Sequence, residues 1–330
     1  MSTIGPYSYD ASILEKALEG KKGGKVLVQL PDGVKRFASE AMYHLEPYLM
    51  NVHIWGGTCF GACDFPNLCE YDLLIQFGHA PIPGVGNEKT VFIPLRRRII
   101  DDSELVMALA NTFGDERPSI TLVSTIETTH DLDRLADVLH SHKYQCVVPD
   151  VIERSYEKGQ VLGCNAGHLD IKTDIAIFIG DGRFHPLGIA LSNPDIRIFT
   201  FKIGNTKLKE LTQDAERVVR IRWAIMENAK KCSRFGVITT MREGQNRVAQ
   251  AEEALLKLRE HGKEAEILMT EIVDIASLLD WDFDAYVVTV CPRLALDDSN
   301  RFHVPVITLQ EMHMILDGAS SSSYTFDTLS

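Results

Sequence analysis

The chain has 330 residues, of which 45% are hydrophobic and 24% charged, so it can bury a large core and is long enough for two or three domains. Its formal net charge of -12 at pH 7 argues against a general nucleic-acid binder, because neutralising phosphates requires a surplus of Lys and Arg. No apolar run is long enough to span a bilayer and the first residues lack the pattern of a signal peptide, which predicts a cytoplasmic protein without a membrane segment.

The chain contains three copies of one pattern of strands and helices. Each copy opens with a short run rich in β-branched residues that ends at a polar or glycine-containing turn, as buried parallel strands do. These opening runs are Lys25 to Leu30, Ile120 to Thr125 and Phe235 to Thr240. A helical pattern of apolar residues follows each run, and three further strand-like runs complete each copy. The further runs are residues 52–55, 73–77 and 90–95, then 145–148, 175–179 and 196–201, then 264–269, 285–290 and 304–309.

Strands that alternate with helices at this spacing predict βαβ units with right-handed crossovers. We therefore expect an α/β fold of three similar domains, each a small four-stranded parallel sheet flanked by helices, in a pseudo-threefold arrangement around a central site. The expected domains span residues 1–100, 101–205 and 206–330. The last residues are serine-rich and lack an apolar period, which predicts a flexible tail from about residue 320.

The cysteines are the residues most suggestive of chemistry. Seven is an odd number, and in a reducing compartment metal ligands and small buried hydrophobes are more plausible than a disulfide framework. Each expected domain carries one cysteine in a loop after a strand: Cys63, Cys164 and Cys291. Ligands of parallel sheets bind at the carboxyl ends of the strands, so these thiols can converge if the three sheets face one axis. Cys146 within a strand and Cys232 at a helix end are most simply packing residues.

Three thiolates are one fewer than the four protein ligands of a structural zinc site or an electron-transfer cluster. A 4Fe-4S cluster held by three cysteines has one open iron, which can bind a substrate. A local alternative exists, because Cys59, Cys63 and Cys69 form a C-x3-C-x5-C stretch. That stretch differs from the C-x3-C-x2-C spacing of ordinary radical enzymes, and it leaves Cys164 and Cys291 unexplained.

Several motifs, in this order, resemble the archaeal 2-(3-amino-3-carboxypropyl)histidine synthase family, which performs the first step of diphthamide biosynthesis. The likeness covers nearly the whole chain. Its motifs are residues 30–33 (LPDG), 60–64 (FGACD), 77–79 (FGH), 159–165 (GQVLGCN), 184–188 (FHPLG), 244–245 (GQ) and 291–298 (CPRLALDD). The family usually has Tyr at the position of Phe60, so this chain lacks one hydroxyl there.

The resemblance implies a homodimer of three-domain subunits, each with a 4Fe-4S cluster held by Cys63, Cys164 and Cys291. It implies transfer of the 3-amino-3-carboxypropyl group from S-adenosylmethionine to an imidazole carbon of one histidine on translation elongation factor two. The open iron would chelate the amine and carboxylate of the methionine moiety. An electron from an unidentified one-electron donor would then cleave the bond between sulfur and the γ-carbon, giving methylthioadenosine.

The same motifs supply a candidate S-adenosylmethionine pocket: His185, Pro186, Gly188, Gln245 and Arg293. Each has a structural alternative. His185 could orient the substrate or serve as a hydrogen-bonded structural histidine. Gln245 could bind ribose or carboxylate, or cap the helix that begins there. Arg293 could pair with the methionine carboxylate, or form a salt bridge with Asp297 or Asp298.

Two other functions fit parts of this pattern. The chain also resembles quinolinate synthase, which implies three α/β domains around a three-cysteine cluster with an open iron. That enzyme, however, performs a condensation and dehydration on small metabolites. It does not explain the GQVLGCN and CPRLALDD motifs. The other alternative is a non-catalytic subunit that binds zinc through structural cysteines and uses its acidic surface for assembly.

Overall fold

The computed structural model describes residues 2–19, 23–48, 51–97, 100–271, 273–278, 280–319 and 324–329. The chain divides into two compact units. The first comprises Met1–Val161, Ala176–Asp181 and Thr200–Leu208, and the second comprises Leu162–Ile175, Gly182–Phe199 and Lys209–Ser330. Within the part of the chain that the structure describes, every helix is too short or too polar to cross a bilayer.

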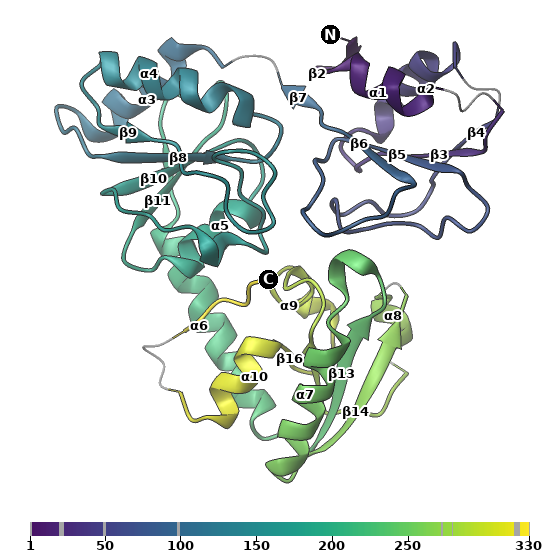
Figure 1. Cartoon of the computed structure of the whole chain (residues 1–330). Coiled ribbons are helices and arrows are strands. Elements are labelled where there is room, and N and C mark those ends of the chain that lie inside the picture. The colour runs from purple at the N-terminus through teal and green to yellow at the C-terminus, as the bar shows by residue number, and fades with distance from the viewer. Residues whose placement is uncertain are drawn as a thin grey trace. The chain divides into compact units, whose positions relative to one another are not determined.

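The strands of the three repeated sheets match the predicted runs to within two residues at most ends (Figure 1). They are β3 Val26–Gln29, β4 Val52–Ile54, β5 Leu73–Phe77, β6 Thr90–Ile93, β8 Ile120–Ser124, β9 Cys146–Val147, β10 Ile175–Ile179, β11 Arg197–Phe201, β13 Arg234–Thr240, β14 Glu264–Thr270, β15 Ala285–Val288 and β16 Val306–Thr308. The two-residue strand β12 Lys209–Glu210 was not expected from the sequence.

One strand order recurs in all three sheets. The first is β4-β3-β5-β6, the second is β9-β8-β10-β11 with β12 added at its edge, and the third is β14-β13-β15-β16. The pairs of the first and third sheets are parallel, as is the β8–β9 pair. Because parallel neighbours need crossover connections, a shared strand order indicates one βαβ plan used three times.

Helices alternate with these strands, which confirms the predicted α/β class. The α-helices are α1 Ala11–Leu18, α2 Ala38–Leu45, α3 Asp102–Phe113, α4 Leu132–Ser141, α5 Phe184–Ser192, α6 Thr212–Ala229, α7 Val248–Glu260, α8 Ile275–Leu278, α9 Arg293–Leu296 and α10 Leu309–Leu316. Short 3-10 helices cover Lys35–Phe37, Thr129–Asp131, Ala166–His168, Glu243–Gln245 and Ser299–Arg301. Each third of the chain holds its own sheet, and the three domain boundaries stay a prediction.

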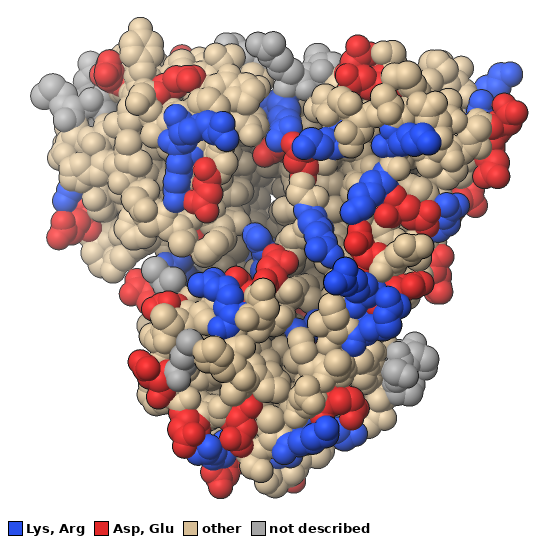
Figure 2. Space-filling model, turned by 180° about the vertical axis from the view of Figure 1, so that it is seen from behind, with Lys and Arg blue, Asp and Glu red and all other residues tan. Residues whose placement is uncertain are grey.

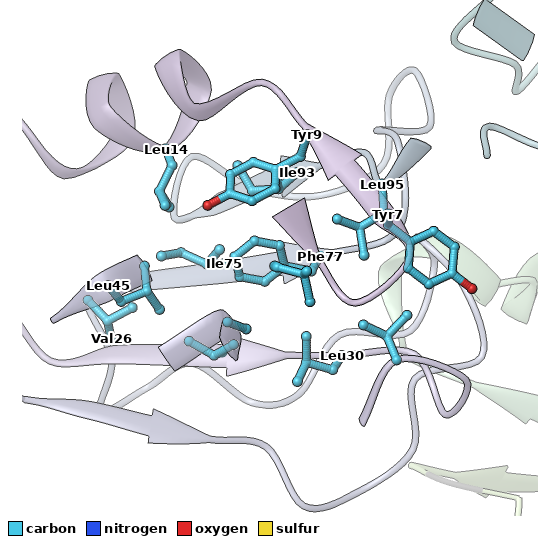
Figure 3. Close-up of a cluster of buried hydrophobic side chains, with 14 of the residues drawn as sticks. Tyr7, Tyr9, Leu14, Val26, Leu30, Leu45, Ile75, Phe77, Ile93 and Leu95 are labelled. Atoms are coloured by element: carbon cyan, nitrogen blue, oxygen red, sulfur yellow. The ribbon is translucent and has the colours of Figure 1, made fainter. Parts of the chain in front are cut away.

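The first sheet buries one face against two helices (Figure 3). Leu14 of α1 and Leu45 of α2 pack with Val26, Ile75 and Ile93, which come from three neighbouring strands. Full burial of such a side chain stabilises a fold by about 1.5–3 kcal/mol. This cluster therefore supplies a firm base for the loops at the carboxyl ends of β3 and β5.

A small antiparallel sheet was not expected from the sequence. It pairs β1 Ser2–Ile4 with β2 Tyr7–Tyr9, and β2 with β7 Arg96–Arg97. The β1–β2 turn contains Gly5 at φ +54°, a conformation that glycine adopts without strain. Strands of two or three residues are too short to show an alternating pattern, so this sheet left no sequence signal.

The third sheet is buried on both faces. Val237 of β13 and Val287 of β15 pack in a cluster with α6, α7 and α10. The next residue on each strand, Ile238 and Val288, belongs to a second cluster that contains α8 and α9. Alternate residues of a strand point to opposite faces, so a continuous apolar run is the sequence signature of such a sheet.

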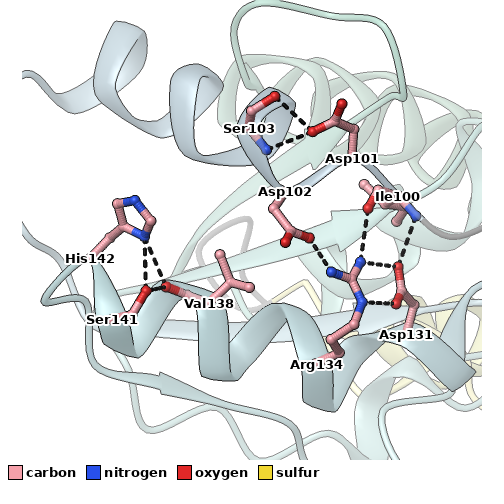
Figure 4. A network of polar contacts seen from close by, with 9 residues as sticks. All are labelled: Ile100, Asp101, Asp102, Ser103, Asp131, Arg134, Val138, Ser141 and His142. Carbon is pink, nitrogen blue, oxygen red and sulfur yellow. Dashed lines mark hydrogen bonds and ion pairs between the residues drawn. The ribbon is translucent and has the colours of Figure 1, made fainter.

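A polar network holds the chain segment that enters α3 (Figure 4). Arg134 of α4 pairs with Asp131 at 2.6 Å, donates to the Ile100 carbonyl at 2.8 Å and also pairs with Asp102. The Ile100 N–H donates to the buried Asp131 carboxylate at 2.9 Å. One guanidinium therefore ties the starts of α3 and α4 together.

Charged side chains of both signs are interspersed on the surface, as Figure 2 shows for one face. Many of them form exposed pairs, such as Arg197 with Glu210 at 3.0 Å and Lys209 with Asp214 at 2.8 Å. Exposed pairs of this kind contribute only about 0.2–1 kcal/mol each. The surface charge therefore bears on solubility and partners more than on folding.

The carboxyl end differs from the expected flexible tail. Residues 320–323 and 330 lie outside the described residues, but residues 324–329 pack against the protein. Phe326 and Leu329 are buried, and the Tyr324 hydroxyl donates to Glu311 Oε1 at 3.0 Å. The segment is neither helix nor strand and has only a few apolar residues, so its sequence shows no helical or strand period.

Candidate functional site

The first cysteine loop is fastened to the carboxyl ends of two strands. Gln29, the last residue of β3, donates from Nε2 to the Asp64 carbonyl at 2.8 Å and to the Thr58 carbonyl at 3.1 Å. Gln76 of β5 donates to Gln29 Oε1 at 2.8 Å, and both glutamines are fully buried. The Asp64 carboxylate accepts from the Thr58 hydroxyl at 3.1 Å, which closes the loop on itself. The half-buried Cys63 thiol thus lies at the functional edge of the first sheet.

The second cysteine lies in a loop organised by a buried asparagine. Asn165 Oδ1 accepts from the Leu162 N–H at 2.8 Å, and the Asn165 N–H donates to the Leu162 carbonyl at 3.2 Å. Upstream, Gln160 forms a parallel bridge with Ser124, the last residue of β8. The loop therefore starts beside the carboxyl end of β8, and Cys164 is half-buried.

The third cysteine lies at the third position after β15, which ends at Val288. Thr289 donates to the Ile238 carbonyl of β13 twice, from its N–H at 3.0 Å and from its hydroxyl at 3.1 Å. Two residues later, the Cys291 carbonyl accepts from the Leu294 N–H at 3.1 Å as α9 begins. Cys291 is also half-buried, so the three predicted thiols share one setting: a loop at the carboxyl edge of a sheet.

The other four thiols are less suited to bind a metal. Burial raises the pKa of Cys59 and of Cys146 to about 12, which disfavours the thiolate that a metal requires. Cys232 donates to the Asp284 carbonyl at 3.3 Å, and burial also raises its pKa. Cys69 is exposed. The three loop thiols therefore stay the predicted ligands of an iron-sulfur cluster.

Among the described residues, no three His, Cys, Asp or Glu side chains form a group that could hold a metal ion. This finding applies to the local set of Cys59, Cys63 and Cys69 as well as to the three loop thiols, so it does not favour one set over the other. Of the predicted ligands, Cys63 belongs to the first compact unit, and Cys164 and Cys291 belong to the second.

Phe184 joins two of the predicted pocket residues to the Cys164 loop. Its ring packs so closely on Gly163 that a side chain at position 163 would clash with it. The Arg293 guanidinium lies 5.0 Å from the centre of the Phe184 ring, and the His185 ring meets that ring edge-on at 5.8 Å. Burial lowers the pKa of His185 to about 4, and the charge of Arg293 adds to this effect. His185 and Arg293 are therefore electrostatic neighbours.

The structural alternative proposed for Arg293 is present. Its Nε donates to Asp297 Oδ2 at 2.9 Å, one turn further along the chain. Pro186 and Gly188 are buried within α5, and a Cβ atom on Gly188 would lie 3.2 Å from the Gly163 carbonyl oxygen. Gly188 thus allows α5 to approach the backbone of the Cys164 loop.

Gln245 lies apart from α5 in the chain, at the end of the turn Glu243–Gln245. Its N–H donates to the Arg242 carbonyl at 2.9 Å. The first N–H of α7 is capped by Asn246, whose Oδ1 accepts from Val248 at 3.2 Å. The role of Gln245 as a cofactor contact stays a prediction.

A neutral His185 predicts a specific pH dependence of stability. Its folded pKa lies below the usual value of about 6.5, so the unfolded chain takes up the proton first as the pH falls. The contribution of the neutral ring to the free energy of unfolding is fully present above pH 6.5 and is lost as the pH falls toward 4. Because the ring is half-buried, we expect His185→Gln to remove about 1–2 kcal/mol of the stability difference between pH 7.5 and pH 5.

Urea unfolding at the two pH values measures this difference. His303→Gln is the matched control, since that imidazole lies in the same unit and is exposed. An equal pH dependence in the wild type and in the His185 variant would contradict the prediction.

Several residues that support the site were not identified from the sequence. Gln29 and Gln76 carry a usable signal, because each is a polar residue near the end of an apolar strand run. Arg247 and Asp327 carry no such signal in the sequence. They meet across 80 positions of chain, and their ion pair at 3.4 Å depends on tertiary packing alone.

The fold and the site together define a class of protein: an α/β chain with three sheets of one strand order, each with a half-buried cysteine at its carboxyl edge. The family described as putative diphthamide synthesis protein matches residues 30–326, and the chain belongs to this family. This finding confirms the resemblance that the motifs indicated.

Named relatives and solved structures agree with this assignment. The chain is 31% identical over 320 residues to 2-(3-amino-3-carboxypropyl)histidine synthase of Pyrococcus horikoshii, which covers 92% of this chain and 89% of that protein. It is 27% identical to the enzyme of the same name from Methanocaldococcus jannaschii, over 94% of this chain and 88% of that one. The crystal structure of Dph2 from Pyrococcus horikoshii with a 4Fe-4S cluster is similar with a TM-score of 0.84 and 31% identity, covering 97% of this chain and 94% of that chain.

Proposed function

We propose that this protein is a transferase of diphthamide biosynthesis. In the proposed reaction it moves the 3-amino-3-carboxypropyl group of S-adenosylmethionine to an imidazole carbon of a histidine on translation elongation factor two. Membership of the diphthamide synthesis family and the name of its relatives support this reaction. The 4Fe-4S cluster in the similar crystal structure supports an iron-sulfur cofactor.

One observation carries the proposal. Each of three sheets with the same strand order has a half-buried cysteine in a loop at its carboxyl edge, in a chain that is similar to a cluster-containing protein over nearly its whole length. We assign Cys63, Cys164 and Cys291 as the ligands of the cluster. Three protein ligands would leave one iron of the cluster open for S-adenosylmethionine.

The cluster would supply the electron that cleaves the bond between sulfur and the γ-carbon of S-adenosylmethionine. The chain itself supplies orientation. Gln29 and Gln76 hold the Cys63 loop on the first sheet, and Asn165 shapes the Cys164 loop. Fixed ligands keep a cluster in one geometry, and a fixed geometry decides which bond of a bound substrate is cleaved.

His185 and Arg293 are proposed to orient the methionine end of the substrate. At neutral pH the His185 ring is uncharged, so it offers a hydrogen bond but no charge. Arg293 offers the positive charge that a carboxylate prefers, and its guanidinium lies 5.0 Å from the centre of the Phe184 ring. Binding the methionine carboxylate would compete with the existing contact to Asp297.

The reaction can be tested directly. Anaerobically purified protein is reduced, mixed with S-adenosylmethionine and archaeal elongation factor two, and analysed by mass spectrometry. We expect methylthioadenosine, and an elongation factor whose mass has increased by one 3-amino-3-carboxypropyl group on a histidine. Protein without reductant serves as the control and should yield neither product.

Other outcomes would support the alternatives. Zinc in place of iron and sulfide would favour a non-catalytic subunit. Iron and sulfide without methylthioadenosine would remove the transferase proposal and leave a different cluster enzyme, such as a quinolinate synthase-like dehydratase. A homodimer is part of the proposal, and light scattering of the purified protein would measure it.

A further inference from the structure

Residues 324–329 end the described chain (marked C in Figure 1) and contact the Cys164 loop. The Leu329 N–H donates to the Cys164 carbonyl at 2.7 Å. Beside it, Thr328 packs on Gly167, where an added Cβ atom would lie 2.6 Å from Thr328 Cγ2. The segment thus touches this loop both at its cysteine and three residues beyond it.

The same segment is joined to the strand end that leads to Cys291. Arg247 Nη1 lies 3.4 Å from Asp327 Oδ1 and also 3.4 Å from the Thr289 carbonyl oxygen. Thr289 is two residues before Cys291, and Asp327 is two residues before Leu329. A short path of contacts therefore runs from the Cys164 backbone through residues 327–329 and Arg247 to the strand end before Cys291. All of these residues belong to the second compact unit.

Burial and charge hold the segment in place. Phe326 is 5% exposed and packs against α5, where a Cβ on Gly188 would lie 3.6 Å from its ring. Burial raises the pKa of Asp327 to about 6, with Arg247 opposing this rise and Glu311 of α10 adding to it. At neutral pH the carboxylate is therefore ionised and can pair with Arg247. Tyr324 anchors the other end through its hydrogen bond to Glu311.

We propose that residues 324–329 are a positioning strap, which fixes the Cys164 loop relative to the strand end before Cys291 and so holds two cluster ligands in register. The strap acts through the ligand loops, and its residues are positioning residues. The family match ends at residue 326, so Asp327, Thr328 and Leu329 lie beyond it. The part that concerns the cluster rests on the proposed function, whereas the restraint on the Cys164 loop does not.

The decisive contact is one backbone hydrogen bond, so the test removes its donor. Leu329→Pro lacks the N–H, and Leu329→Ala is the matched control that keeps the N–H and shortens the side chain. Peptide-level hydrogen exchange of the metal-free protein reports on residues 162–168. The rate at which an iron chelator strips the reconstituted protein anaerobically, together with its EPR signal after reduction, reports on the cluster.

We expect Leu329→Pro to raise exchange in residues 162–168 about fivefold, as expected for the loss of one net hydrogen bond. Iron should be lost faster by a similar factor and the EPR signal should change, while Leu329→Ala stays close to the wild type. Exchange in β13 should be unchanged in both variants, which shows that the fold is intact.

A second variant guards against a local effect of proline. Asp327→Asn keeps the shape of the side chain but removes its charge, and it should accelerate exchange in residues 162–168 in the same direction. Unchanged exchange in both Leu329→Pro and Asp327→Asn overturns the strap. Faster exchange with unchanged iron loss and EPR signal overturns its role toward the cluster. If the wild-type protein binds no iron, the proposed function and the cluster role both fail, and the exchange data still decide whether the strap restrains the loop.

Discussion

Replacing Cys164 with alanine is expected to reduce both iron retention and formation of methylthioadenosine by more than about 100-fold. Even partners that only orient a metal ligand are worth about 10- to 100-fold, so loss of a ligand from a set of three should cost more. Cys63→Ala and Cys291→Ala should behave in the same way, because all three thiols are half-buried in loops at the carboxyl edges of their sheets. Iron and sulfide per chain, together with product formed under reducing conditions, measure the effect.

The remaining cysteines provide matched controls in the same chain. Cys146→Ala and Cys232→Ala remove thiols whose pKa is raised by burial, so they should leave the iron content unchanged. Cys69→Ala removes an exposed thiol and should also be neutral. Cys59 is the sharpest control, because it belongs to the same loop as Cys63 but is buried. If Cys59→Ala and Cys69→Ala lost iron while Cys164→Ala kept it, the local ligand set would replace the proposed one.

The repeated sheets could be predicted from the sequence because each parallel strand is an unbroken apolar run between turns. Buried on both faces, a strand such as Ala285–Val288 needs no polar alternation, so the apolar run reveals the strand. The predicted run of residues 285–290 extended two residues past its end, because Thr289 and Val290 are β-branched as well. The strand β12 and the antiparallel pair β1–β2 have two or three residues each, too few for any periodic signal. Their existence depends on neighbours far along the chain.

The cysteine loops could be identified for a similar reason. Each combines a thiol with a strand end, and a strand end is visible in the sequence. The contacts that hold these loops in place are harder to predict from the sequence than the strand ends. The buried Gln29–Gln76 pair spans 47 positions, and the Arg247–Asp327 pair spans 80. Interactions at such separations arise from packing, so a single sequence contains the partners but not the pairing.

A buried ion pair between two helices that pack on the third sheet provides the prediction with the largest expected effect on stability. Arg222 of α6 and Glu311 of α10 are both almost fully buried and pair through Nε to Oε1 at 2.8 Å. Arg222 also donates to the Ala295 and Val306 carbonyls, each at 2.7 Å. Arg222→Met would leave the Glu311 charge without its guanidinium and two carbonyls without their donor.

We expect Arg222→Met to lower the free energy of unfolding by about 3–5 kcal/mol, the usual cost of leaving one member of a buried ion pair behind. Arg220→Met is the matched control on the same helix, because the Arg220–Glu216 pair is exposed and should contribute no more than about 1 kcal/mol. The double variant Arg222→Met with Glu311→Met should regain part of the loss, since an apolar pair leaves no buried charge. Urea denaturation of the wild type, the two single variants and the double variant measures these differences in the free energy of unfolding. If the double variant were less stable than Arg222→Met alone, the orphaned carboxylate would not be the source of the penalty, because Glu311 would then stabilise the fold even without Arg222, through its bonds from the Thr308 N–H at 2.9 Å and the Tyr324 hydroxyl at 3.0 Å.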